Sequence, residues 1–163
     1  EAADLFRWFP ILAMFLTPVL GGFLDTKGKG ATMLMLGAII MIACHLSFAF
    51  LLPVYPQKWF ALLLIVVLGV SFSLVPAALW PSVPKIIDPV ILGSAYSLIF
   101  WIQNVGLCFV PLIIGNALKA TGGYTVPMII FASFGIIAFF MSLLLKVEDR
   151  KKGYGLELPN IKK

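Results

Sequence analysis

Residues 59–83 read WFALLLIVVLGVSFSLVPAALWPSV, an apolar run without one charged side chain. About 20 mainly apolar residues are enough for a helix to cross the hydrocarbon core of a membrane. In this run apolar residues occur on every helical face, as expected where lipid or other helices surround a helix. Similar runs occur at about 5–24, 31–52, 90–118 and 124–145. The ten-residue alternation of an outer-membrane barrel is missing, so the sequence predicts an all-α membrane protein with five transmembrane helices.

The composition leads to the same fold class. Of the 163 residues, 61% are hydrophobic and 12% are charged, whereas a soluble domain is about half apolar and about a quarter charged. The mean hydropathy is +1.06, which leaves too little polar surface to cover a water-soluble globule. The net charge of +5 comes from short connections and the C-terminal part of the chain. Because no basic patch follows the chain, we expect the lipid bilayer and not a nucleic acid as partner.

Short connections with glycines or prolines separate the apolar runs, so neighbouring helices should be antiparallel. Cationic residues gather on one side of the predicted topology: Lys27, Lys29, Lys85, Lys146, Arg150, Lys151, Lys152, Lys162 and Lys163. The other side holds Arg7, Lys58 and Lys119. Positive charge marks the cytoplasmic side of a membrane protein. The predicted organisation is therefore a helical bundle over residues 1–146 and a basic cytoplasmic tail over 147–163.

The start of the chain does not look like a leader peptide. The first residue is Glu1 and not methionine, and the first apolar run is full length and is followed by four more. A cleaved signal peptide has a shorter apolar region. We therefore expect the chain to be a fragment of a longer protein.

Residues 21–30, between the first two predicted spans, read GGFLDTKGKG. This stretch resembles the signature loop of the major facilitator superfamily, G-x-L-a-D-r-x-G-r-k, which joins the second and third helices of each six-helix half. Thr26 and Gly30 stand where basic residues are usual, as is common in the C-terminal copy of the loop. The matching residues are Gly21, Asp25, Gly28 and Lys29. The resemblance implies that the five spans are helices eight to twelve of a twelve-helix transporter, whose partner is a missing N-terminal six-helix half.

Two further stretches carry the resemblance. Residues 104–115, NVGLCFVPLIIG, resemble the eleventh helix of the family, and residues 74–83 with 92–96 resemble the branch that contains lysosomal dipeptide transporters and their bacterial relatives. The resemblance implies a secondary transporter, in many relatives a proton-coupled symporter, that moves a small-molecule solute such as a short peptide by alternating access. It implies no cofactor. Short loops favour a bacterial inner membrane, with a lysosomal membrane as the alternative.

The signature loop has chemistry suited to a gate. The carboxylate of Asp25 lies where the chain leaves the membrane and can accept hydrogen bonds from the amides at a helix N-terminus. The fourth span begins near residues 92–94 on the same side, which makes it the expected partner. Gly21 should let the first span approach a neighbouring helix closely. The alternative is that Asp25 only ends a helix at the membrane interface.

Polar side chains at membrane depth usually face the bundle interior, and transporters bind substrate near the midplane. The resemblance implies that helices eight, ten and eleven line the cavity. The candidate cavity residues are Gln103, Asn104, Trp101, Ser71 and Ser73. These side chains can equally serve as hydrogen-bonding contacts between packed helices.

His45, Cys44 and Cys108 lie inside apolar runs. The histidine has no carboxylate at helical spacing and is expected to be neutral and hydrogen-bonded, and the cysteines are expected to pack without forming a disulfide or a metal site. A membrane-embedded enzyme would need paired aspartates or an H-E-x-x-H helix, and the chain has neither. We therefore expect no enzyme activity, while a non-transporting scaffold or receptor stays open as an alternative.

Overall fold

The computed structural model describes residues 8–161, and within that range it contains helices and no strand. All five long helices are long and apolar enough to cross a membrane. This confirms the predicted all-α membrane fold. The elements are α2 (Trp8–Lys27), α3 (Gly30–Leu46) continued by the π-helical segment η1 (Ser47–Leu51), α4 (Lys58–Ile86), the 3-10 turn η2 (Pro89–Ile91), α5 (Leu92–Thr121) and α6 (Thr125–Lys152).

The helices overlap the expected spans, but α2, α4 and α5 end at Lys27, Ile86 and Thr121, past the expected 24, 83 and 118. The largest difference lies at the C-terminus. The last span was expected to end at residue 145, but α6 continues to Lys152. Glu148 and Lys152 form an ion pair of 2.9 Å at positions i and i+4, a spacing that supports a helix. Gly153 then ends the helix with a φ of 69°, a conformation that favours glycine. The predicted start of the first span, Arg7, Lys162 and Lys163 lie outside the described residues.

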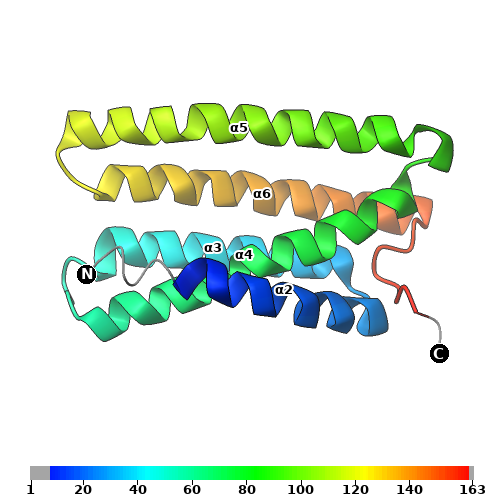
Figure 1. The fold of residues 1–163 in the computed structure, drawn as a ribbon, viewed down its shortest axis with the longest axis horizontal. Helices are drawn as coiled ribbons and strands as arrows, with labels where there is room; N and C mark the ends of the chain where they lie inside the picture. The colour runs from blue at the N-terminus through cyan, green and yellow to red at the C-terminus, as the bar shows by residue number, and fades with distance from the viewer. Residues whose placement is uncertain (1–7, 162–163) are drawn as a thin grey trace.

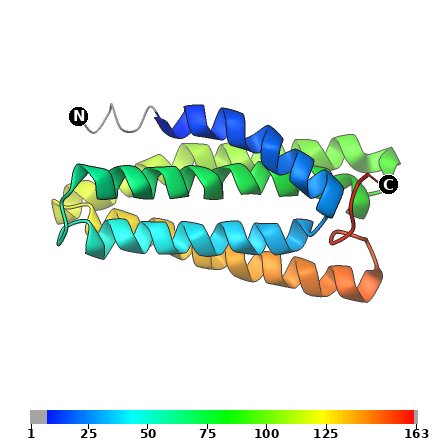
Figure 2. The ribbon, with the colours of Figure 1, turned by 90° about the horizontal axis from the view of Figure 1, so that it is seen from below.

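Helix α3 forms the centre of the bundle. It packs against α4 on one side and α6 on the other, while α2 packs on α4, and the two views of the ribbon show this order (Figures 1 and 2). A buried cluster of Leu24, Leu34, Ala77 and Ala78 joins α2, α3 and α4. Since hydrophobicity alone does not drive helices together in lipid, the contacts between these helices depend on close packing.

Small residues allow that close packing. A Cβ added to Gly135 of α6 would lie 2.7 Å from Cγ1 of Ile42 in α3, and one added to Gly37 of α3 would lie 3.5 Å from the carbonyl oxygen of Ser71 in α4. The hydroxyl of Ser71 donates a hydrogen bond of 2.6 Å to the carbonyl of Gly37. Gly135 therefore sets how closely α3 and α6 approach, while α3 and α4 are joined at Gly37 and Ser71 by an ordinary contact and a hydrogen bond.

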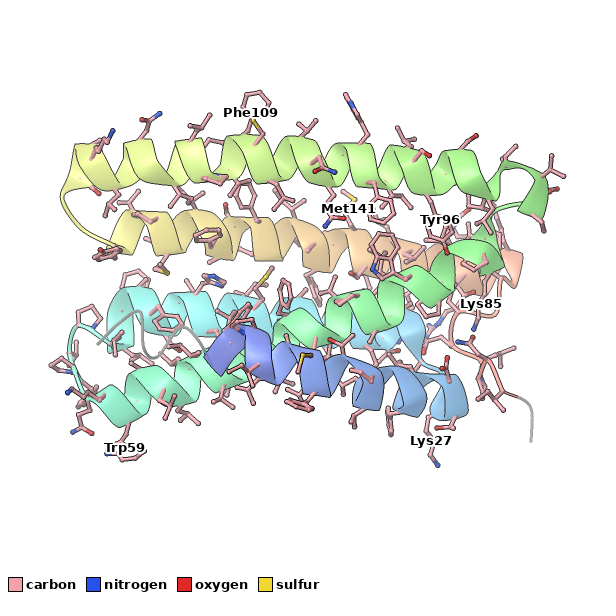
Figure 3. All side chains as sticks on the ribbon, in the orientation of Figure 1. Lys27, Trp59, Lys85, Tyr96, Phe109 and Met141 are labelled. Carbon is pink, nitrogen blue, oxygen red and sulfur yellow. The ribbon has the colours of Figure 1, made fainter. Side chains whose placement is uncertain are left out.

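Helix α5 is attached more loosely than the others. None of its side chains is buried, and Phe109 points away from the bundle (Figure 3). Its contact with α4 is aromatic: the rings of Trp80 and Phe100 stack at 4.9 Å, and the Tyr96 hydroxyl donates to the Trp80 carbonyl at 3.2 Å. The long apolar face of α5 is thus left uncovered by the described part of the chain.

The helices alternate in direction, as predicted. Lys27 and Lys85 lie at one end of the bundle with the C-terminal segment, and Trp59 lies at the other (Figure 3). We call the first of these the lysine-rich end. It gathers the turn between α2 and α3, the connection between α4 and α5, and residues 153–161 (Figure 1).

Candidate gating loop and cavity residues

The signature loop folds as a two-residue turn between α2 and α3. Gly28 and Lys29 have φ values of 73° and 67°, in the left-handed region where glycine is free of steric cost. A Cβ added to Gly28 would lie 2.4 Å from the carbonyl oxygen of Glu157. Gly28 is therefore needed for its backbone angle and also because the C-terminal segment passes directly over it.

Asp25 lies in the last turn of α2 and contacts that same segment. Its Oδ1 accepts a hydrogen bond of 2.6 Å from the side-chain amide of Asn160, and its backbone carbonyl accepts from the amides of Asn160 and Ile161 at 3.0 Å each. The expected partner was the start of the fourth span. At the start of the fourth span the Val90 amide donates instead to Asp88, at 2.9 Å. The Asp25 carboxylate is held by the chain's own C-terminal part.

Of two other loop residues, Gly21 differs from expectation. Nothing lies within 4 Å of a Cβ added to Gly21, so the close approach expected there is not made by the described part of the chain. Thr26, at a position where a basic residue is usual, donates to the carbonyls of Gly22 and Phe23 at 3.1 and 3.0 Å. Its hydroxyl therefore forms hydrogen bonds within α2 itself.

The sequence did not indicate that the C-terminal segment belongs to this site. The missed residues that contact the loop or its neighbours are Lys85, Lys146, Asp149, Leu156, Glu157 and Asn160. The sequence does hold one indication of this contact. Gly153 and Gly155 allow the chain to reverse sharply, and the apolar residue Leu156 follows directly after them. A polar tail with such an apolar residue is compatible with a segment that folds back and buries it.

Two of the candidate cavity residues are buried in helix packing. The exposed fractions of Ser71 and Ser73 are 1% and 0%. Ser71 bonds to Gly37 of α3, as described above, and Ser73 donates to the Gly69 carbonyl of its own helix at 2.8 Å. These hydrogen bonds account for both hydroxyls without a solute.

The candidates on α5 lie apart from the serines. Gln103 lines a cavity of about 630 Å³ between α5 and Phe131 of α6, together with Gly106, Leu107, Val110, Pro111, Ile114 and Gly115. Asn104 is exposed and donates to the Phe100 carbonyl at 2.8 Å, and Trp101 is 66% exposed. The structure therefore does not bring the five candidates together.

His45 and Cys44 lie in helix packing, whereas Cys108, which was expected to pack, is exposed. His45 Nδ1 lies 2.8 Å from the Met41 carbonyl, and its ring packs 5.2 Å from that of Phe131. Cys44 is buried and Cys108 is exposed, and both are free thiols. Within residues 8–161 no group of His, Cys, Asp or Glu side chains could hold a metal ion.

Five antiparallel helices of membrane length, with a glycine-and-aspartate loop at the lysine-rich end, define an integral, multi-pass membrane protein. Comparison with known proteins agrees. The chain is 33% identical over 142 residues to the lysosomal dipeptide transporter MFSD1 of Danio rerio, covering 87% of this chain and 29% of that protein. Against the Gallus gallus and Homo sapiens proteins of the same name it is 32% and 29% identical over 144 and 146 residues.

The chain belongs to the major facilitator superfamily. It spans about 30% of the length of the curated relatives that it matches. No family model matches the chain, and no solved structure is significantly similar to it.

Proposed function

We propose that this chain forms part of a secondary active transporter that moves a small organic solute, most specifically a short peptide, by alternating access. The observation that carries the proposal is the similarity to dipeptide transporters over nearly the whole chain. The five membrane-length helices support it, since such transporters are built from repeated helical bundles that rock around a site near the midplane. The remaining helices of the transporter, including the six-helix N-terminal half, would supply the other wall of the path.

The proposed orientation puts the lysine-rich end in the cytoplasm. It gathers Lys27, Lys29, Lys85 and the basic end of α6, and cationic loops are retained on that side during insertion. Of the two membranes considered from the sequence, the lysosomal one is supported by the names of the relatives. The bacterial inner membrane has no such support.

Within this transporter we propose two working regions. The loop residues Gly21, Asp25, Gly28 and Lys29 act as part of a gate at the cytoplasmic end. The α5 residues Gln103, Asn104 and Trp101 lie on a helix none of whose residues is buried, so their side chains are open to a solute. Gln103 is favoured among them because it lines the cavity beside α6 and its amide offers both donors and an acceptor.

Uptake by the full-length protein tests the proposal. The protein would be reconstituted in liposomes and supplied with labelled dipeptides, sugars or organic anions, with empty liposomes as control. We expect saturable dipeptide uptake that unlabelled dipeptides inhibit and sugars do not. A folded, correctly inserted protein that moves none of these solutes would contradict the transporter assignment, and saturable uptake of another solute class would contradict the peptide assignment.

A further inference from the structure

Helix α3 begins without a capping side chain of its own. The residue at its N-cap is Lys29, which is in the left-handed conformation and makes no side-chain capping bond. The first four amides of a helix have no partner within the helix. A buried helix end with unpaired amides would be unfavourable, so another part of the molecule must supply the acceptors.

The C-terminal segment supplies them. The amide of Lys29 donates to the carbonyl of Glu157 at 3.1 Å, and the amide of Gly30 donates to the carbonyl of Leu156 at 2.9 Å. The Thr32 amide donates to Oε1 of Glu157 at 2.8 Å. Three of the four unpaired amides at the start of α3 are therefore satisfied by two consecutive residues far along the chain.

The Glu157 carboxylate also links α3 to α6. Its second oxygen, Oε2, accepts a hydrogen bond of 2.7 Å from the Thr32 hydroxyl, and that hydroxyl accepts one of 2.5 Å from the ammonium group of Lys146. A carboxylate at a helix N-terminus is stabilised by the helix dipole, and hydrogen bonds to a charged group are stronger than neutral ones. Glu157 thus provides both the missing cap and the missing negative charge.

Three further contacts hold the segment in this position. Leu156 is 1% exposed, and its amide donates to Oδ1 of Asp149, a carboxylate that is itself 6% exposed. The ammonium group of Lys85, at the end of α4, donates to the carbonyls of Gly155 and Leu158 at 3.0 and 2.9 Å. Figure 3 shows Lys85 beside the segment.

We propose that residues 153–161 are a latch that closes the lysine-rich end, and that Glu157 is a positioning residue for the signature loop. By capping α3 from outside, Glu157 fixes the turn at Gly28 and Lys29, and Asn160 fixes Asp25 one turn earlier. The ends of α2, α3, α4 and α6 are thereby joined into one unit. The consequence for transport rests on the proposed function, because it assumes that the loop acts as a gate.

Amide hydrogen exchange on the full-length protein in detergent or nanodiscs tests the latch directly. In Glu157→Ala the Thr32 amide should exchange at least tenfold faster, while amides in the middle of α3 keep their rate. Replacing residues 155–161 by a glycine-serine sequence of the same length should also release the amides of Lys29 and Gly30. Glu148→Gln, which removes a carboxylate from the same end of α6 but not from the latch, should change none of them. Unchanged exchange at residues 29–32 in the Glu157→Ala protein would overturn the proposal.

Transport kinetics test the positioning role. Glu157→Ala should lower the maximal uptake rate several-fold without changing KM, because Glu157 contacts the start of α3 and not the candidate solute residues on α5. Glu157→Gln keeps an acceptor oxygen and should restore part of the rate. Faster exchange with an unchanged uptake rate would reduce the latch to a structural cap and overturn its role in gating. If the unaltered protein moves no solute, the proposed function fails, while the exchange result still decides whether the latch exists.

Discussion

The side-chain amide of Asn160 donates a hydrogen bond of 2.6 Å to Oδ1 of Asp25, across 135 positions of the chain. The same asparagine also donates its backbone amide to the Asp25 carbonyl. The aspartate of the signature loop is therefore held by a neutral partner from its own chain. One carboxylate oxygen, Oδ1, is engaged in this way, and the charge itself is not neutralised by that partner.

Replacing Asp25 with Asn should slow transport while expression stays largely intact. The amide keeps an acceptor for Asn160 but loses the charge, and a hydrogen bond to a charged group contributes about 1.5 kcal/mol or more, so the contact that holds the loop is weakened. The uptake rate per inserted protein is the measurement. Asp88→Asn is the matched control, because asparagine also caps a helical turn well. A normal uptake rate for Asp25→Asn would remove the gating role.

Replacing Gly28 with Ala should destabilise the protein more than replacing Gly122 with Ala. Both glycines have positive φ values, 73° and 65°, and an L-residue in that conformation costs about 1–2 kcal/mol. Only at Gly28 would the new Cβ overlap the C-terminal segment, whereas nothing lies within 4 Å at Gly122. Overpacking costs about 1–3 kcal/mol in addition. Equal thermal stability of the two detergent-solubilised variants would mean that the segment does not cross Gly28.

Replacing Ser71 with Ala removes its hydroxyl and should weaken the contact between α3 and α4. The hydrogen bond to Gly37 is then lost, and an interhelical hydrogen bond in a membrane protein contributes about 0.6 kcal/mol on average. Ser73→Ala removes a bond within one helix and should change stability less. Both variants should keep the KM of the unaltered protein. A raised KM for Ser71→Ala with unchanged stability would instead return that serine to the solute path.

Removing the side-chain amide of Gln103 or Asn104 on α5 should change the apparent affinity for the solute. Gln103→Ala should raise KM several-fold, since a lost hydrogen bond contributes about 1 kcal/mol, and Asn104→Ala should also alter KM. Cys108→Ala is the control, because this exposed residue on the same helix is not a predicted contact. Uptake over a range of dipeptide concentrations measures the effect. An unchanged KM for Gln103→Ala and Asn104→Ala would assign both side chains to packing or to contacts with the rest of the transporter.

The membrane helices were predictable because each one is a local property of the chain. A spanning helix satisfies its backbone hydrogen bonds internally, so an apolar run of sufficient length is enough to define it. The predicted span at 31–52 accordingly matches Gly30–Leu51. The end of α6 was missed although its signals were local, since the Glu148–Lys152 pair and Gly153 both mark a helix that continues past the membrane.

The candidate site was less predictable. The glycines and Asp25 of the loop were identified from their order along the chain, but the partner of Asp25 was not. Ser71 and Gln103 both looked like polar residues at membrane depth. Only the rotation of each helix in the bundle decides that Ser71 faces α3, while Gln103 faces a cavity beside α6.

The sequence by itself therefore determined the number of helices, their alternating direction and the gathering of lysines at one end, because hydropathy and charge act through short stretches of chain. Only the tertiary structure decided that Glu157 caps α3 and that Asn160 holds Asp25. Those contacts join residues 125 and 135 positions apart. Their geometry depends on where four helix ends meet in space, which no local pattern specifies.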